Sequence, residues 1–138
     1  MKATAILLAG LLCGAMLQAP AAHAEDAHAA APSGPVFVPV APLVVPVFSA
    51  GQVRLHLYYV LQLEAGDADA GARIREQMPR LRDAYLRALA GMADRIGDGP
   101  VPDDERVKRT LGAASERVLG PHVVNGILIQ RSFSRRAS

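Results

Sequence analysis

The 138-residue chain has no tryptophan, only three phenylalanines and three tyrosines, and a formal net charge of +2. Proteins that bind single-stranded nucleic acid stack bases on aromatic side chains, and aromatic residues make up only 4% of this chain. Electrostatic binding to a duplex requires a concentrated basic face, which so small a net charge does not provide. We therefore exclude nucleic acid as a partner.

Cysteine is also scarce, because the single cysteine, Cys13, lies within an apolar N-terminal segment. Once that segment is removed, the chain has no thiol and forms no disulfide, so packing alone must stabilise it. The four histidines are widely separated, and no Cys-x-x-Cys motif or glycine-rich phosphate loop occurs. We therefore expect no metal and no cofactor. Because no nucleophile is paired with a base, we also expect that the protein is not an enzyme.

The N-terminus has the pattern of a secretory signal. One lysine precedes an uncharged apolar run over residues 3–17, and Ala22 and Ala24 form a small-x-small cleavage site before Glu25. Residues 1–24 are therefore predicted to be a signal peptide, which suggests a bacterial secretory route and a periplasmic location. The alternative is an uncleaved anchor in the inner membrane, if the alanine-rich stretch that follows counts toward the span of about 20 residues that a bilayer needs.

Two segments precede the regular part of the chain. Residues 25–34 are small and polar and are predicted to form a flexible leader. Residues 35–49 are apolar but carry Pro39, Pro42 and Pro46. Proline has no N–H to donate, so this segment is not an interior strand. It is either an extended, polyproline-like arm or an edge strand whose prolines face away from the ladder, and its valines predict burial.

Residues 52–64 alternate between apolar and polar side chains, which is the pattern of a half-buried strand. A turn at residues 49–51 joins this strand to the preceding arm, so the two are predicted to form a hairpin. One face carries Val53, Leu55, Leu57, Tyr59, Leu61 and Leu63. The other face is polar, with Val60 as the exception. We expect the apolar face to pack under helices.

After a turn at residues 65–69, the hydrophobic period changes to that of a helix. The apolar stripe consists of Ile74, Met78, Leu81, Tyr85, Leu89 and Met92. Pro79 lies inside this stripe, so we expect either a kink or two abutting helices there. A second helix is predicted to begin at residues 102–105 and to end at Gly120.

Residues 122–130 are rich in β-forming side chains and are predicted to form the last strand, with Asn125 and Gly126 as a bulge or local bend. The predicted order is β-β-α-α-β. This is an α+β fold in which two helices cover one face of a small antiparallel sheet. The domain is expected to cover residues 35–133, and residues 134–138 are expected to form a polar tail.

Arg54, His56 and Tyr58, together with Glu64, share the polar face of the alternating strand. An imidazole, a guanidinium and a carboxylate on one surface could in principle act as an acid/base site. The outer face of an antiparallel sheet often has the same composition without any catalytic role. We therefore interpret Arg54, His56 and Tyr58 as a solvated or partner-facing surface. The acidic run at residues 103–105 lacks the spacing of a calcium loop and is interpreted as a helix start.

Taken in order, these segments resemble the periplasmic domain of the flagellar basal-body-associated FliL family. The resemblance covers residues 36–133, in the arm FVPVAPLVVPV, the strand RLHLYYVLQLE, the helix REQMPRLRDAYLRAL and the closing strand VVNGILIQRSF. Its most distinctive part is Met78-Pro79 followed by Leu81-Arg82-Asp83. Gln130 also lies where the closing strand of the family has a glutamine.

The resemblance implies a stomatin/prohibitin-like fold and a non-enzymatic role in flagellum-dependent motility. Members of the family support the stator units of the flagellar motor by protein–protein contact. The expected partner is therefore the flagellar stator or another inner-membrane complex, and self-association of the chain stays open. Family members normally keep an uncleaved transmembrane helix. Because this chain has a cleavage site instead, the alternative is a soluble periplasmic paralogue that binds another envelope partner or a small ligand.

Overall fold

The computed structural model of the chain describes residues 34–137. The predicted signal peptide, its cleavage site at Ala22, Ala24 and Glu25, and nearly all of the predicted leader lie outside the described residues. Within the described part of the chain, no helix combines the length and the apolar composition that crossing a membrane would require.

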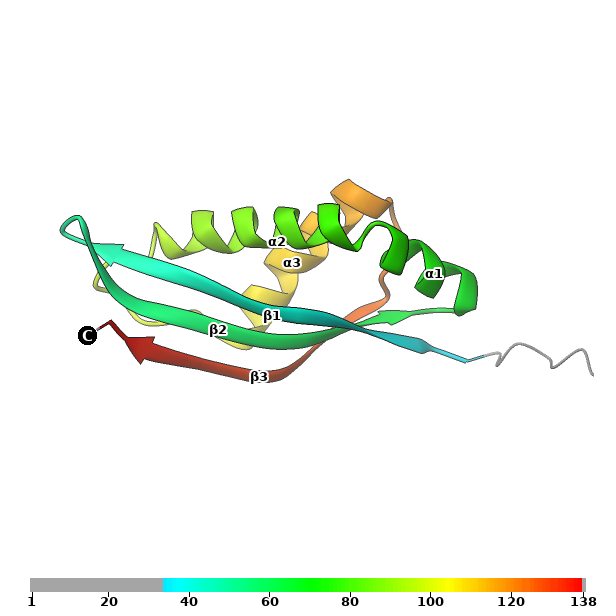
Figure 1. The fold of residues 1–138 in the computed structure, drawn as a ribbon, viewed down its shortest axis with the longest axis horizontal. Helices are drawn as coiled ribbons and strands as arrows, with labels where there is room; N and C mark the ends of the chain where they lie inside the picture. The colour runs from blue at the N-terminus through cyan, green and yellow to red at the C-terminus, as the bar shows by residue number, and fades with distance from the viewer. Residues whose placement is uncertain (1–33, 138) are drawn as a thin grey trace, which may run out of the picture.

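Three strands form one antiparallel sheet in the order β1-β2-β3. The strands are β1 (Val36–Ser49), β2 (Gln52–Ala65) and β3 (Gly126–Arg136). The helices α1 (Ala68–Glu76), α2 (Met78–Ala93) and α3 (Asp104–Leu119) all lie on one side of this sheet (Figure 1). The prediction of an α+β fold with helices on one face of a small antiparallel sheet is therefore confirmed.

From Leu55 to Ala65 the central strand β2 has the predicted alternation, whereas a register shift at Arg54 pairs Val53 with the exposed Phe48. Its apolar face is buried by the helices and by the neighbouring strands, and its polar face is only half-buried. The largest fully buried side chains come from all parts of the fold and include Leu43, Leu57, Leu61, Leu63, Ile74, Leu81, Tyr85, Leu89, Met92 and Leu111. The predicted helical stripe from Ile74 to Met92 thus supplies much of the core.

The hairpin between β1 and β2 has the expected turn. Ser49 pairs with Gln52, so the loop consists of Ala50 and Gly51 alone. Their φ angles are 48° and 76°, and a two-residue loop with two positive φ angles matches the twist of the flanking strands. Of the two alternatives for residues 35–49, the edge strand is therefore the one that forms.

Both outer strands bulge at the level of Val60, the residue that breaks the alternation of β2. In β1, Ala41 and Pro42 together lie opposite the single residue Val60, between the pairs Val40–Leu61 and Leu43–Tyr59. In β3, Gln130 is the extra residue between Ile129 and Arg131, which pair with Leu61 and Val60. The predicted bulge at Asn125-Gly126 is wrong in position, because these residues precede and open β3. A Cβ at Gly126 would lie 2.9 Å from the Glu64 Oε2, which is the end of a flexible side chain and can move away, so packing does not require glycine there.

The first predicted helix is two abutting helices, which was one of the two expected outcomes at Pro79. Asp67 caps α1 by accepting a 2.8 Å hydrogen bond from the Ala70 N–H. Gln77 then separates α1 from α2, and Pro79 falls in the first turn of α2. Proline is tolerated there because the first N–H groups of a helix have no partner within the helix.

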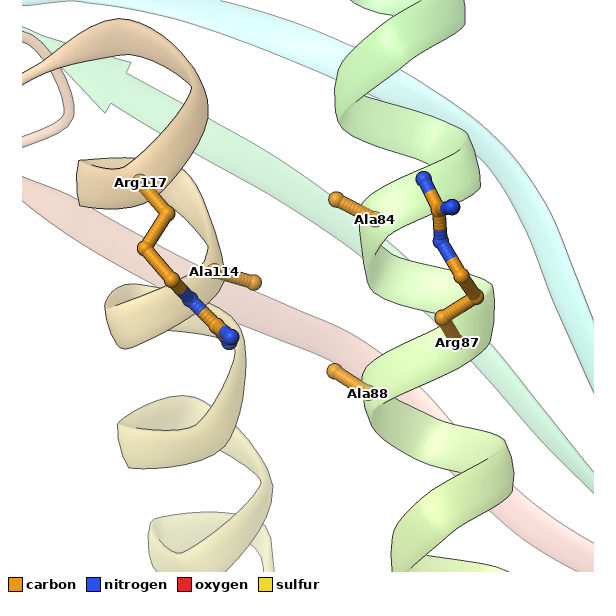
Figure 2. Close-up of a pocket in the computed structure, with 5 residues that line it drawn as sticks. All are labelled: Ala84, Arg87, Ala88, Ala114 and Arg117. Carbon is orange, nitrogen blue, oxygen red and sulfur yellow. The ribbon is translucent and has the colours of Figure 1, made fainter.

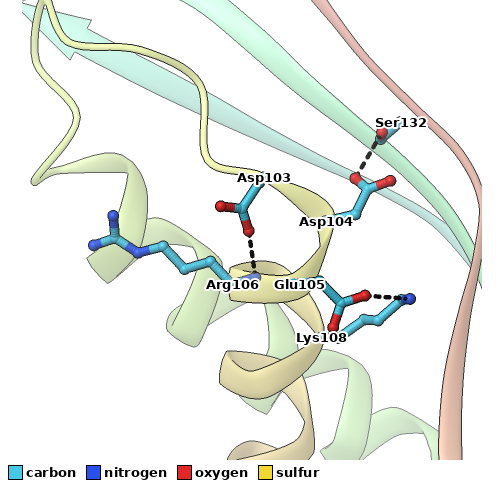
Figure 3. A network of polar contacts seen from close by, with 6 residues as sticks. All are labelled: Asp103, Asp104, Glu105, Arg106, Lys108 and Ser132. Carbon is cyan, nitrogen blue, oxygen red and sulfur yellow. Dashed lines mark hydrogen bonds and ion pairs between the residues drawn. The ribbon is translucent and has the colours of Figure 1, made fainter.

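The acidic run at residues 103–105 begins α3, as predicted, and also ties the helix to the sheet (Figure 3). The Asp103 carboxylate accepts a hydrogen bond of 2.7 Å from the Arg106 N–H, which is the N-cap interaction. The Asp104 carboxylate accepts a hydrogen bond of 2.9 Å from the Ser132 hydroxyl on β3. Glu105 forms an exposed ion pair with Lys108 one turn later.

The C-terminal end of the fold corrects the predicted domain limits. The helix α3 ends at Gly120, whose φ of 87° is typical of glycine. The last strand begins later than predicted and runs to Arg136, so three residues of the predicted polar tail belong to β3. The arginine-rich composition indicated a solvated tail, but backbone pairing with β2 does not require apolar side chains.

A polar contact joins α2 and α3 within the core. The Ser115 hydroxyl donates to the Leu111 C=O at 2.9 Å, and the Tyr85 hydroxyl lies 2.6 Å from the same Ser115 oxygen. Because the single hydroxyl hydrogen of Ser115 points to Leu111, Tyr85 must donate to Ser115. Burial raises the pKa of Tyr85 to about 12, so Tyr85 stays protonated and keeps this donor.

This contact predicts an order of mutational effects. Ser115→Ala leaves the Tyr85 hydroxyl buried without an acceptor, which should lower the free energy of unfolding by about 1–3 kcal/mol. Tyr85→Phe removes the donor and leaves Ser115 still bonded to Leu111, so it should cost less, about 0.5–1.5 kcal/mol. Urea unfolding of both variants measures the difference, and a larger cost for Tyr85→Phe would refute the assigned direction.

A second prediction tests which face of β2 is buried. Leu57→Asp places a carboxylate without a partner in the core, which costs several kcal/mol and should unfold the domain. His56→Asp, one residue earlier on the other face, lies opposite Arg135 and should change the free energy of unfolding by no more than about 0.5 kcal/mol. Circular dichroism and thermal melting of the two variants would contradict the fold if Leu57→Asp were tolerated.

Candidate interaction surface

The side of the sheet opposite the helices exposes large apolar side chains. We call this side the open face. The three phenylalanines of the chain, Phe37, Phe48 and Phe133, are 46%, 47% and 48% exposed, and Val44 and Leu128 are also exposed. Side chains of this size are usually buried, and several of them on one side of a small domain are typical of a contact surface. None of the three phenylalanines contributes to the core.

The centre of the open face is a row of three side chains, one from each strand. Val44 of β1 lies opposite Tyr58 of β2, and Tyr58 lies opposite Phe133 of β3. The rings of Tyr58 and Phe133 are stacked, with centroids 4.7 Å apart and an interplanar angle of 2°. The His56 ring lies 6.5 Å from the Tyr58 ring and is tilted to it by 54°. We call Val44, His56, Tyr58 and Phe133 the aromatic row.

The structure separates the three predicted surface residues. His56 and Tyr58 lie together in the aromatic row, as the alternation of β2 predicts. Arg54 instead binds the loop between α2 and α3, where its guanidinium donates to the C=O groups of Gly99 at 3.1 Å and Asp98 at 3.5 Å. Arg54 therefore positions this loop against the hairpin end of the sheet and is not part of the exposed row.

The basic residues of β3 border the aromatic row. Arg131 lies opposite Val60, and Arg135 lies opposite His56. A shallow hollow of about 330 Å³ is lined by His56, Tyr58, Arg135, Arg136 and Ala137. The guanidinium groups and the imidazole around this hollow can donate to a carboxylate or another anion.

The geometry does not support the acid/base alternative for this face. His56 and Glu64 are eight residues apart on one strand, and a strand rises about 3.3 Å per residue, so they lie roughly 26 Å apart. A general base must be within hydrogen-bond reach of the group on which it acts. Among the described residues, no cluster of His, Cys, Asp and Glu has the arrangement to hold a metal ion.

A groove of about 310 Å³ lies between α2 and α3 on the helical side (Figure 2). Ala84, Ala88 and Ala114 line it, and their small side chains allow the two helices to approach closely. The two arginines beside the groove already have partners. Arg87 forms an ion pair with Asp83, and Arg117 donates to the Ala113 C=O at 3.1 Å. The groove is therefore explained by helix packing and by bonds within each helix.

Most of the open face could not be identified from the sequence. Phe37 and Val44 were expected to be buried with the rest of the arm, and the bulge at residues 41–42 that sets their side was not predicted. Phe133 and Arg135 were placed at the domain limit and in the tail. Continued pairing of β3 to Arg136 puts both on the same face as Tyr58. The alternation of residues 131–136 was the signal available for them.

The fold and this surface define a class: a two-layer α+β domain with one covered and one open sheet face. Compared with protein-family models and with curated proteins, the chain matches none of them.

The stacked pair gives a prediction for stability. Tyr58→Ala and Phe133→Ala should each destabilise the domain slightly, and a double-mutant cycle between them should give a coupling energy of about 0.5–1.5 kcal/mol. Tyr58 and Phe37 are the control pair, because Phe37 lies opposite Glu64, six residues along β2 from Tyr58. That pair should be additive. Urea unfolding measures both cycles, and additivity of the first would show that the rings do not interact.

Proposed function

We propose that the protein is a non-enzymatic cell-envelope protein that acts through protein–protein contact on its open face. The observation that carries this proposal is the aromatic row, in which Tyr58 and Phe133 stack across two strands and Phe133 is 48% exposed. Rigid, partly exposed aromatic side chains bordered by arginines are enriched at the centres of protein interfaces. The helical side presents no comparable group of large exposed apolar residues among those that the structure describes.

The more specific proposal is a role in flagellum-dependent motility, as a FliL-like protein that supports the stator of the motor. Its support is the sequence resemblance over residues 36–133, including Met78-Pro79 and Gln130. The α+β fold, with a proline-containing edge strand leading into the alternating strand, agrees with the segment order on which the resemblance rests. In this proposal the protein is periplasmic, and its N-terminal segment either directs export or keeps it at the inner membrane.

One observation favours a second candidate, a soluble periplasmic paralogue that binds a small ligand. The hollow beside His56, Tyr58 and Arg135 has a volume of about 330 Å³ and is lined by cationic groups. A small carboxylate would fit this chemistry. A thermal-shift screen with organic acids distinguishes this candidate, because a ligand that binds only the native state raises the melting temperature.

Deletion of the gene in its own bacterium tests the flagellar proposal. The deletion strain should swim more slowly in viscous medium, where the motor works under high load, and the wild-type gene should restore the speed. Phe133→Asp should not restore it, because a carboxylate in the aromatic row removes the stacked ring. Ala113→Asp, an exposed position on α3, is the matched control and should restore swimming fully. Normal swimming of the deletion strain under load would overturn the flagellar role.

A further inference from the structure

The sheet has two edge strands, and each has only one neighbour. An edge strand presents unpaired N–H and C=O groups to which another strand can bond. In the order β1-β2-β3, the free edges belong to β1 and β3. Figure 1 shows β3 at the margin of the sheet, with no further strand beside it.

One hydrogen bond determines which backbone groups point outward. The Ala137 N–H donates to the Arg54 C=O at 3.0 Å, in the same register that pairs Leu55 with Arg136. In an antiparallel pair, every second residue bonds to the partner strand. Arg54, His56 and Tyr58 therefore bond to β3, and the residues between them bond to β1.

The free edge of β1 is closed by proline and arginine. Leu57 bonds to β1, so its partner Val45 directs its backbone groups toward β2, and the next residue, Pro46, directs its backbone nitrogen toward the outer edge. Beyond the bulge, the same alternation places the backbone nitrogen of Pro39 at the outer edge. Proline has no N–H, so these positions offer no donor. At the bulge, the Arg82 guanidinium donates to the C=O groups of Ala41 at 2.6 Å and Pro42 at 3.1 Å, and so occupies the acceptors there.

The free edge of β3, in contrast, keeps its outward backbone donors and acceptors available. Gly126–Arg136 contains no proline. By the same count, the N–H and C=O groups of Ser132, Ser134 and Arg136 point away from β2. All residues from Arg131 to Arg136 are exposed. Beyond the bulge at Gln130, residues 131–136 therefore form an uninterrupted template for one more strand.

The charge of β3 indicates what kind of strand fits. Arg131, Arg135 and Arg136 are its only charged residues, and none of them forms an ion pair among the described residues. A second copy of β3 in antiparallel pairing would bring these arginines together, and like charges on facing strands destabilise a pair. An acidic strand would gain the favourable interaction instead.

A pocket on the helical side of β3 adds a position for an apolar side chain. It has a volume of about 170 Å³ and is lined by Leu57, Tyr59, Val101, Pro102, Ser132, Phe133 and Ser134. The Tyr59 hydroxyl is buried on its wall and has no hydrogen-bond partner among the described residues. Burial, and then the Asp104 carboxylate, raise the pKa of Tyr59 to about 12, so the hydroxyl keeps its proton and can donate.

We propose that β3 binds an extended, acidic segment of a partner protein by strand addition at its free edge. Acidic residues would lie opposite Arg131 and Arg135, an apolar or aromatic residue would lie beside Phe133, and alternate side chains would enter the pocket at Val101. Backbone bonds supply affinity in this mode of recognition, and the alternate side chains supply specificity. The proposal rests on the proposed function as a contact protein and names the chemistry of its partner.

A synthetic peptide tests the proposal with the full chain and independently of motility. The probe is Ac-Ser-Glu-Val-Phe-Val-Glu-Ser-amide, whose palindromic sequence serves either strand direction. Its control replaces both glutamates with lysine. In a titration of the ¹⁵N-labelled protein followed by NMR, the acidic peptide should slow amide exchange at Ser132 and Ser134. It should bind about tenfold more tightly than the lysine peptide.

Variants of β3 identify the edge. Ser134→Pro removes one outward N–H, as Pro46 does in β1, and should weaken peptide binding about tenfold, whereas Ser134→Ala should leave it unchanged. Circular dichroism checks that both variants are folded. If Ser134→Pro does not fold, the double substitution Arg131→Glu and Arg135→Glu serves instead, because it should reverse the preference so that the lysine peptide binds more tightly.

Several outcomes would overturn the proposal. They are no binding of the acidic peptide, equal binding of the two peptides, protection of β1 amides instead of β3 amides, and unchanged binding in folded Ser134→Pro. Protection of Ser132 and Ser134 on concentrating the protein alone would show that a second copy occupies the edge. A normal motility phenotype together with selective peptide binding would reject the flagellar role and keep the strand-addition site.

Discussion

Leu57, Leu61 and Leu63 are almost completely removed from water because β2 is the middle strand and the helices lie over its apolar face. Complete burial of one such side chain stabilises a fold by about 1.5–3 kcal/mol, so this face dominates the stability of a domain that has no disulfide among its described residues. A shift of β2 by one residue would move all of these leucines to the open face. The register of both outer strands therefore depends on this burial.

In this register, the two edges of the sheet differ in whether another strand can pair with them. The β1 edge is interrupted by prolines, and Arg82 on α2 holds its bulge through two backbone carbonyls. The β3 strand is tied to the helical layer through its side chains, for example where the Ser132 hydroxyl donates to the Asp104 carboxylate, and its outer backbone groups stay available. The same fold thus blocks pairing on one side and leaves it available on the other. Asymmetry of this kind allows a small sheet to bind one strand without growing at both edges.

The sequence was sufficient to predict the elements that have a regular hydrophobic period. The alternation of residues 52–64 predicted β2 and its two faces, and the stripe from Ile74 to Met92 predicted the helical layer. Pro79 predicted the break that the structure shows as two abutting helices. The bulges could not be predicted, because their positions depend on pairing between strands that are distant in sequence. For the same reason the side of Val44 and the extension of β3 to Arg136 could not be deduced. Arg54 lies at a further register shift, opposite Val47 and Phe48 of β1, and its partners come from a loop more than 40 residues away, so its departure from the polar face could not be deduced either.

We propose that the protein meets its partner through the open face and the β3 edge, and that the helical layer supports these two surfaces. Site-specific photo-cross-linking in intact cells tests it most directly. A photo-reactive amino acid replaces Phe133 on the open face in one strain and Ala113 on α3 in another, and mass spectrometry identifies the adducts. We expect an adduct to an envelope protein from position 133, at an acidic extended segment of that protein, and none from position 113. Adducts that form from position 113 and not from position 133 would contradict it.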